Sequence, residues 1–171
     1  MTSLFKNYVR TLKLYNVLGL VSGCLIITSL LFPWWRIVVE GRPGTNVYPY
    51  VISGDASLIL GYERTAVMIV LTCILVACVA LCFVGSTLKG KKGKTMLGAV
   101  GIILLLVAVC FIWRISTHCE LYRVPMQGNI VVLGFTVTTG FQVGLYLAIL
   151  AGCLCIISIA LHEKIKISRS Q

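Results

Sequence analysis

Six residues near the middle of the chain, 89–94, hold four lysines and two glycines, and they lie between two long segments without a charged residue. The uncharged segments, 65–88 and 95–113, have the length and apolar character of helices that cross a bilayer. Lysine in short loops is retained on the cytoplasmic side of a membrane. We therefore expect Lys89, Lys91, Lys92 and Lys94 to form a cytoplasmic hairpin that sets the orientation of both helices.

The composition favours a membrane protein over a soluble domain. Of the 171 residues, 58% are hydrophobic and 12% are charged, and a soluble domain of this size could not cover so much apolar surface. The net charge is +10, but the lysines gather in the two tails and in the hairpin at 89–94. We interpret this charge as a topology signal with affinity for lipid headgroups, and we expect no nucleic-acid partner.

Two further apolar runs extend this interpretation to the whole chain. We expect one integral domain over 1–171 in the plasma membrane, with both termini cytoplasmic. The expected helices are about 14–33, 65–88, 95–113 and 141–161, and the expected outer loops are 34–64 and 114–140.

The outer loops contain β-branched segments at 36–40, 46–53 and 129–139, which favour strands, and a turn is expected at 126–129. The predicted fold class is therefore all-α membrane. It is a four-transmembrane-helix bundle with a small extracellular β-sheet built from the two outer loops.

Tryptophan and arginine recur together where two predicted helices end. Trp34, Trp35 and Arg36 follow Pro33, and Trp113 and Arg114 close the third predicted helix. Indole rings suit the headgroup layer because they are apolar with one polar N–H, and arginine reaches the phosphates. We predict that these five residues are membrane-interface anchors.

Small residues recur at helical spacing in three of the predicted helices. Such residues let helix backbones approach closely, so that dispersion contacts hold the helices together in lipid. The predicted helix-packing positions are Gly19, Gly23, Gly98, Gly101, Gly144, Ala148 and Gly152. The spacing of Gly19 and Gly23 is compatible with a homodimer and, at least as well, with packing inside a bundle.

The order of these features carries a resemblance. A Pro-Trp-Trp at 33–35 precedes a strand-rich loop, a basic hairpin, and Gly-Phe-Gln-Val-Gly-Leu-Tyr-Leu-Ala at 140–148. This order resembles small prokaryotic four-span proteins of the tryptophan-associated type, and its layout is similar to that of claudin-like tetraspan proteins. Claudins carry a Gly-Leu-Trp and two cysteines in the first loop, which this chain lacks, so the resemblance assigns no functional residue.

The sequence offers no recognisable catalytic, cofactor or metal site. Seven of the eight cysteines lie in predicted helices without a Cys-x-x-Cys, and we interpret them as packing residues. Cys119 is expected in an outer loop, as a free thiol or a bridge to a partner. His118 and His162 are expected at opposite membrane faces, which excludes a haem held between them. No expected helix contains an acid, a base or a histidine for ion transport.

Two functions remain open at this point. In the first, the protein is not an enzyme and acts through contacts with other membrane proteins or with itself. It would be an accessory subunit of a membrane complex or a claudin-like self-associating component. In the second, it is a carrier or channel for an uncharged or lipid-like ligand, which apolar helices would not exclude.

Overall fold

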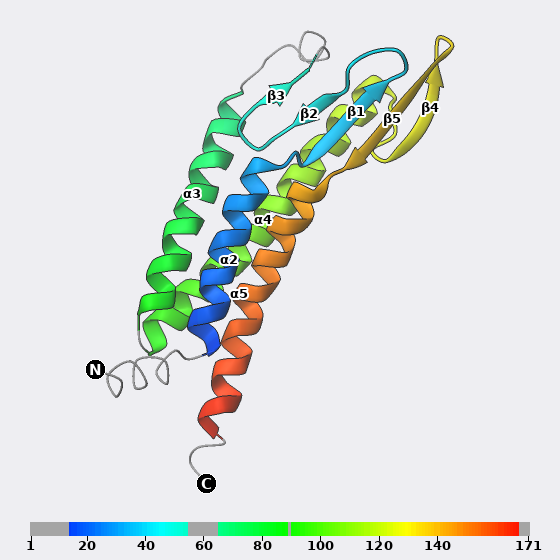
Figure 1. Cartoon of the computed structure of the whole chain (residues 1–171). Coiled ribbons are helices and arrows are strands. Elements are labelled where there is room, and N and C mark those ends of the chain that lie inside the picture. The colour runs from blue at the N-terminus through cyan, green and yellow to red at the C-terminus, as the bar shows by residue number, and fades with distance from the viewer. Residues whose placement is uncertain (1–13, 55–64, 89, 168–171) are drawn as a thin grey trace, which may run out of the picture.

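The structure, a computed structural model, describes residues 14–54, 65–88 and 90–167. In chain order its elements are α2 (Leu14–Leu31), β1 (Trp35–Val39), β2 (Thr45–Val47), β3 (Ile52–Ser53), α3 (Ala66–Thr87), α4 (Lys91–Tyr122), β4 (Gly128–Val132), β5 (Phe135–Phe141) and α5 (Val143–Ile167). These four helices run alongside one another and pack in a closed ring, α2 against α3 and α5, and α4 against α3 and α5. The strands gather at one end of these helices (Figure 1).

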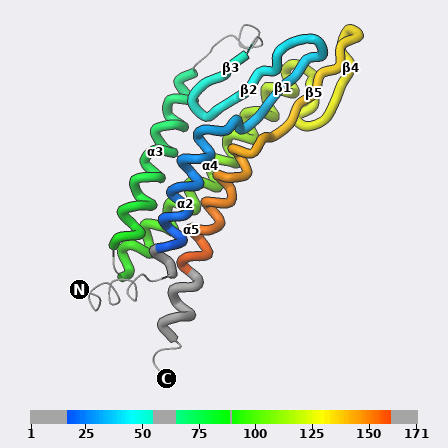
Figure 2. The backbone as a smooth tube through the Cα atoms, viewed as in Figure 1, coloured from blue at the N-terminus to red at the C-terminus, as the bar shows by residue number. Residues whose placement is uncertain are grey.

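The strands form one antiparallel sheet that joins two distant parts of the chain. Its order is β3-β2-β1-β5-β4. Strands β1 to β3 come from the first predicted loop and β4 and β5 from the second. The central pairing of β1 with β5 runs from Trp35↔Phe141 to Val39↔Val137, and Figure 2 shows these two strands side by side. Both contain β-branched residues, which fit a pleated surface.

The predicted class, all-α membrane with a four-transmembrane-helix bundle, is wrong. The strands form a five-stranded antiparallel sheet. Among the described residues, only α3 and α4 are long and apolar enough to cross a membrane. The apolar helical segments Val17–Leu31 and Val143–Ile159 are shorter. In the part of the chain that the structure describes, the fold is four helices packed in a closed ring, with a sheet at one end. Pro33 follows the end of α2, and α5 begins two residues after β5 ends at Phe141.

The second outer loop starts later than predicted because α4 is much longer than 95–113. The helix begins at Lys91 and ends at Tyr122. Its buried face continues through Phe111, Ile115 and Cys119, four residues apart, so the core-facing stripe extends beyond the uncharged run. Arg123 ends the helix with a left-handed backbone, φ 54°. Charge therefore predicted where the apolar run ends, but not where the helix ends.

Other boundaries differ less. Helix α3 begins after Thr65, whose side-chain oxygen accepts a hydrogen bond from the Met68 N–H at 3.4 Å, close to the expected 65–88. Helix α2 ends at Leu31 rather than 33, and α5 extends over 143–167 rather than 141–161. The turn expected at 126–129 is wrong, since β4 and β5 are joined through Leu133 and Gly134.

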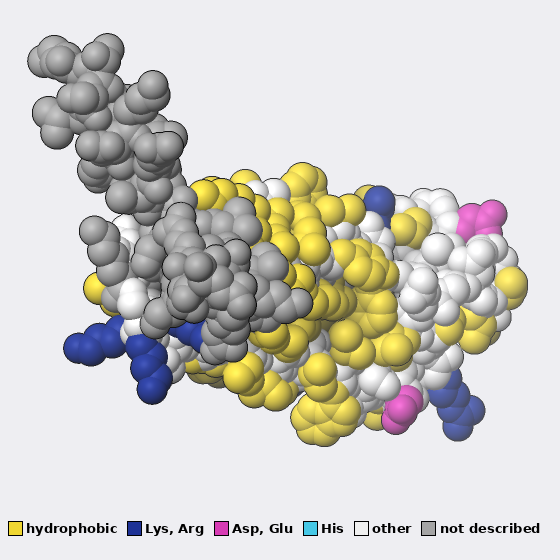
Figure 3. Space-filling view, turned by 90° about the horizontal axis from the view of Figure 1, so that it is seen from below, with side chains coloured by type: hydrophobic (Ala, Val, Ile, Leu, Met, Phe, Trp, Pro, Cys, Tyr) yellow, Lys and Arg dark blue, Asp and Glu magenta, His cyan; other side chains and the backbone are white. Residues whose placement is uncertain are grey.

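The helices carry apolar residues on both their inner and outer faces. Leu75, Leu97 and Leu104 are fully buried between helices. Other large apolar side chains on α3 and α4 point outward, namely Val67, Ile69, Val70, Val76, Ile102, Leu106 and Val109. Figure 3 shows apolar side chains covering the middle of one face, with charged ones toward its ends. A helix that is apolar all round is typical of a membrane span.

Candidate functional site

The sheet is joined to the helices around a fully buried Trp34. Its indole N–H donates to both the carbonyl oxygen and the hydroxyl oxygen of Ser29, each at 3.1 Å. The Ser29 hydroxyl in turn donates to the Gly144 carbonyl at 2.8 Å. The Trp34 ring meets Phe111 of α4 edge to face, with centroids 5.0 Å apart. Residues of α2, α4 and α5 thus hold the start of the sheet.

Gly144 is required at this junction because the backbone of another segment occupies the space beside it. A Cβ there would meet the Phe32 carbonyl oxygen, and it would lie 2.7 Å from the Pro33 carbonyl oxygen. The Gly144 N–H also donates to that Pro33 oxygen at 3.0 Å. The predicted packing role of Gly144 therefore concerns the corner between α2 and α5.

The anchor interpretation is wrong for both tryptophans of the Pro-Trp-Trp. Trp34 is fully buried, and Trp35 is almost fully buried and donates its indole N–H to the Met126 carbonyl at 3.0 Å. A buried indole N–H needs an acceptor, and both rings find one inside the protein. Sequence reasoning missed Ser29, the acceptor of Trp34. Its position five residues before the tryptophan was the only available signal.

The other predicted anchors lie on the surface. Arg36 is exposed on β1. Trp113 is 72% exposed, and Arg114 is half-buried. Both Trp113 and Arg114 lie within α4 rather than at its end. Their role as anchors in a membrane interface stays a prediction.

The small residues expected to pack helices face neighbouring helices of the same chain. A Cβ on Gly19 would meet the Ser86 hydroxyl of α3, and one on Gly23 would lie 3.3 Å from the Phe83 ring. A Cβ on Gly101 of α4 would lie 2.9 Å from the Gly152 carbonyl oxygen of α5.

The remaining two positions follow the same pattern. Gly98 faces Ile159 of α5, and Ala148 is fully buried. These surfaces are therefore used inside the chain and are not free for a second one.

The buried cysteines behave mainly as core residues. Cys82 of α3 and Cys155 of α5 bring their sulfur atoms to 3.7 Å, and Cys78 is buried beside them. Over the described ranges, no group of three or more His, Cys, Asp or Glu residues could hold a metal ion. Cys119, expected in an outer loop, lies in α4 and is buried.

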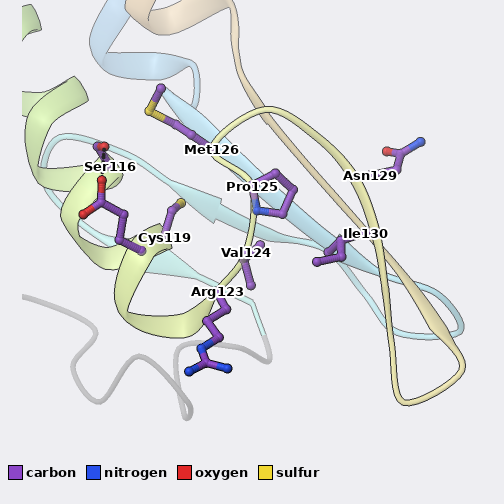
Figure 4. A pocket seen from close by; sticks show the side chains of 9 residues that line it. Ser116, Cys119, Arg123, Val124, Pro125, Met126, Asn129 and Ile130 are labelled. Atoms are coloured by element: carbon purple, nitrogen blue, oxygen red, sulfur yellow. Dashed lines mark hydrogen bonds between the residues drawn. The ribbon is translucent and has the colours of Figure 1, made fainter.

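A hollow of about 500 Å³ separates the end of α4 from β4. Ser116 and Cys119 lie on its helix side, and Asn129 and Ile130 on its strand side (Figure 4). It is wide open, and on its helix side the Ser116 hydroxyl donates to the Glu120 carboxylate over a long 3.5 Å. An open hollow of this kind does not enclose a small ligand.

The β4–β5 hairpin presents the most exposed apolar group of the sheet. Val131 is 69% exposed and Leu133 is 94% exposed, and Phe135 is largely exposed too. We call these three residues the hairpin tip. Leu133 and Gly134 both have positive φ, 52° and 83°, as a type I′ turn requires. A left-handed backbone costs leucine roughly 1–2 kcal/mol, so the fold tolerates strain to keep this side chain at the turn.

One carboxylate braces the hairpin close to its turn. The Thr136 N–H donates to Glu40 Oε2 at 3.1 Å, and the Glu40 N–H donates to the Thr136 carbonyl at 2.8 Å. Hydrogen bonding from Thr136 lowers the pKa of the Glu40 carboxyl below its ordinary value.

The lysines of the predicted hairpin lie at the opposite end of the molecule from the sheet. Lys91, Lys92 and Lys94 fall in the first turns of α4, and Lys89 lies outside the described residues. Cations at a helix N-terminus oppose its dipole. These charges therefore do not stabilise the helix they begin.

No protein-family model matches the chain, and no curated protein is significantly similar to it. The resemblance to tryptophan-associated and claudin-like proteins stays a prediction.

Proposed function

We propose that this protein is a multi-pass integral membrane protein that acts through contacts with other proteins, presented by its sheet on the outer side of the plasma membrane. The observation that carries the proposal is the hairpin tip, where Val131, Leu133 and Phe135 are exposed at the end of a well-paired sheet. Exposed apolar groups of this kind mark interaction sites. The strained backbone of Leu133 supports the same function, since strain persists where a residue serves another purpose.

The orientation follows from the distribution of charge. The start of α2, the α3–α4 connection and the end of α5 lie at one end of the helices, and the sheet lies at the other (Figure 1). Lys91, Lys92 and Lys94 belong to the first end. Because lysine is retained in the cytoplasm, that end is cytoplasmic, both termini are too, and the outward apolar faces of α3 and α4 contact lipid.

A contact function is better supported than transport or catalysis. The interior between the helices is filled by buried side chains such as Leu75, Leu97 and Leu104, which leaves little support for a carrier or channel. The small-residue surfaces are occupied by neighbouring helices of the same chain. The hairpin tip is therefore the surface on which an accessory or self-associating role would depend.

The test is a triple substitution of the tip, Val131→Thr, Leu133→Asn and Phe135→Thr, in the full chain expressed in its native membrane. Mild detergent extraction followed by light scattering measures the mass of the assembly that contains the protein. We expect the wild type to be part of an assembly larger than one chain, and the triple variant to be released from it. Thr138→Asn, at an exposed β5 position away from the tip, is the matched control and keeps the assembly.

Two results would contradict the proposal. One is a wild-type protein that extracts as a single chain without a partner. The other is a folded triple variant whose assembly has the same mass as that of the wild type.

A further inference from the structure

The two edges of the sheet differ in how well they are protected against pairing with another strand. At one edge, β3 has only two residues, Ile52 and Ser53, and Gly54 follows with a φ of +119°. At the other edge, β4 has five residues without a charge, a proline or a bulge, and most of them are exposed. Natural sheets shield their edges with short strands or charges. The β4 edge has neither.

The hydrogen-bond pattern identifies which backbone groups of β4 face outward. The Glu40 N–H donates to the Thr136 carbonyl, so the backbone of Thr136 points toward β1. Backbone direction alternates along an antiparallel strand. The backbone N–H and C=O groups of Phe135 and Val137 therefore point toward β4, where these residues pair with Val132 and Ile130.

The alternation continues across β4. Its residues that pair through the backbone with β5 are Gly128, Ile130 and Val132, as the two-residue turn after Val132 also requires. The N–H and C=O groups of Asn129 and Val131 consequently point to the open edge. These four groups are placed symmetrically about Ile130.

We infer that the β4 edge pairs antiparallel with the β4 edge of a second copy of this chain, with the twofold axis at Ile130. In this register Val131 of each copy exchanges two backbone hydrogen bonds with Asn129 of the other, and Ile130 faces its own counterpart. The inference rests on the proposed function and names the partner that the sheet would bind.

A second copy fits this edge better than an unrelated strand for two reasons. Strand β4 has no charge, so pairing it with itself brings no like charges together. The short β3 edge cannot accept β4 and start an open chain of copies. The pair is therefore closed at two chains, as an isologous interface requires.

The direction of the hairpin determines how the two copies would be arranged. The hairpin extends away from the helices, and β5 passes into α5 through the single residue Gln142 (Figure 1). An antiparallel β4 pair would direct the helices of the two copies away from each other. The two copies would then belong to two membranes whose outer sides face each other.

The test is disulfide capture at the axis. Ile130→Cys is made in a Cys119→Ser background, because Ile130 and Cys119 line the same hollow and could otherwise react within one chain. The full chain is reconstituted in vesicles and oxidised with copper phenanthroline. The two thiols introduced at position 130 would face each other at the axis within disulfide range. We expect a covalent dimer with at least about tenfold more yield than for the control.

The control is Val132→Cys in the same background, on the same strand and facing solvent. In the proposed register the two copies of position 132 are four residues apart along the strands, about 14 Å, which is beyond disulfide range. Equal yields for the two variants, or no dimer from a folded Ile130→Cys protein, would overturn the inference.

The facing-membrane arrangement is tested with two vesicle populations of different fluorescence. We expect vesicles to cluster, and mixed dimers to form, only when both populations carry the protein. Dimers that form solely between chains of one vesicle would overturn this arrangement. If the Ile130→Cys test fails while the hairpin-tip triple variant still loses its assembly, the proposed function stands and its partner is another protein.

Discussion

The α4–α5 contact and the β4–β5 hairpin are neighbours in the chain, but their side chains meet different surroundings. Between α4 and α5, Gly101 leaves no room for a side chain and Gly152 very little, and each faces the other's carbonyl oxygen. In the hairpin, Val131 and Leu133 are largely exposed and face outward. Close packing is thus completed between the helices, whereas the sheet retains apolar surface that its own chain does not cover.

The largest effect on stability is expected from a substitution that disrupts the close packing of the helices. Gly144→Leu would force a side chain against the Phe32 and Pro33 carbonyl oxygens, and rigid backbone cannot yield. We expect a loss of about 3 kcal/mol or more in the free energy of unfolding. Thermal unfolding in detergent measures it. Gly140→Leu is the control, since a Cβ there would have only the Gln142 amide nitrogen at 4.0 Å. Equal losses at both sites would refute the packing argument.

Trp34→Phe tests the same junction through its hydrogen bonds. Phenylalanine fills most of the indole volume but leaves the Ser29 oxygens without their donor in a buried site. The expected cost is about 1–3 kcal/mol. The control is Trp113→Phe, at an exposed α4 position, which should change stability by less than about 0.5 kcal/mol. A Trp34 variant as stable as the Trp113 variant would show that Trp34 is not a structural support.

In the hairpin we expect a substitution that raises the free energy of unfolding instead of lowering it. Asparagine tolerates a left-handed backbone better than leucine, so Leu133→Asn should stabilise the protein by about 1 kcal/mol. The same change should weaken association, because it removes the most exposed apolar side chain of the tip. Chemical denaturation measures the first effect and light scattering of extracted assemblies the second. A more stable variant that associates as well as the wild type would show that Leu133 is not part of the contact surface.

The smallest expected effect on stability comes from protonation of the Glu40 carboxylate. Its pKa is lowered in the folded protein by hydrogen bonding to Thr136, so its contribution to stability is complete at neutral pH. That contribution is lost as the pH falls through the folded-state pKa. Glu40 is exposed, so we expect only local loosening, seen as weaker protection of the Thr136 amide from hydrogen exchange in acid, relative to the intrinsic exchange rate at the same pH. Glu40→Gln should remove this pH dependence. Its persistence in that variant would assign the effect to another group.

The sequence predicted those features that depend on local composition. The uncharged run begins at Thr65, and α3 begins directly after it. The β-branched residues of 36–40 and 129–139 correspond to strands. The expected class was nevertheless wrong, because a hydropathy pattern counts apolar runs and does not reveal how long each helix is or how strands assemble.

Features that depend on tertiary contacts were beyond local reasoning. Trp34 and Trp35 have the composition of interface anchors, and only the packing of Ser29, Phe111 and Met126 around them makes them core residues. The turn was misplaced because Gly128 and Asn129 are favoured turn residues, whereas a leucine with positive φ at 133 is rarely expected.

The link between β5 and α5 has a mechanical consequence. Only Gln142 separates the two elements, and its N–H donates to the Trp34 carbonyl at 3.0 Å, beside the bond from Gly144 to Pro33. Because no flexible loop lies between β5 and α5, a force applied to the sheet would be transmitted directly to α5. The sheet and α5 would then tilt together as one rigid lever.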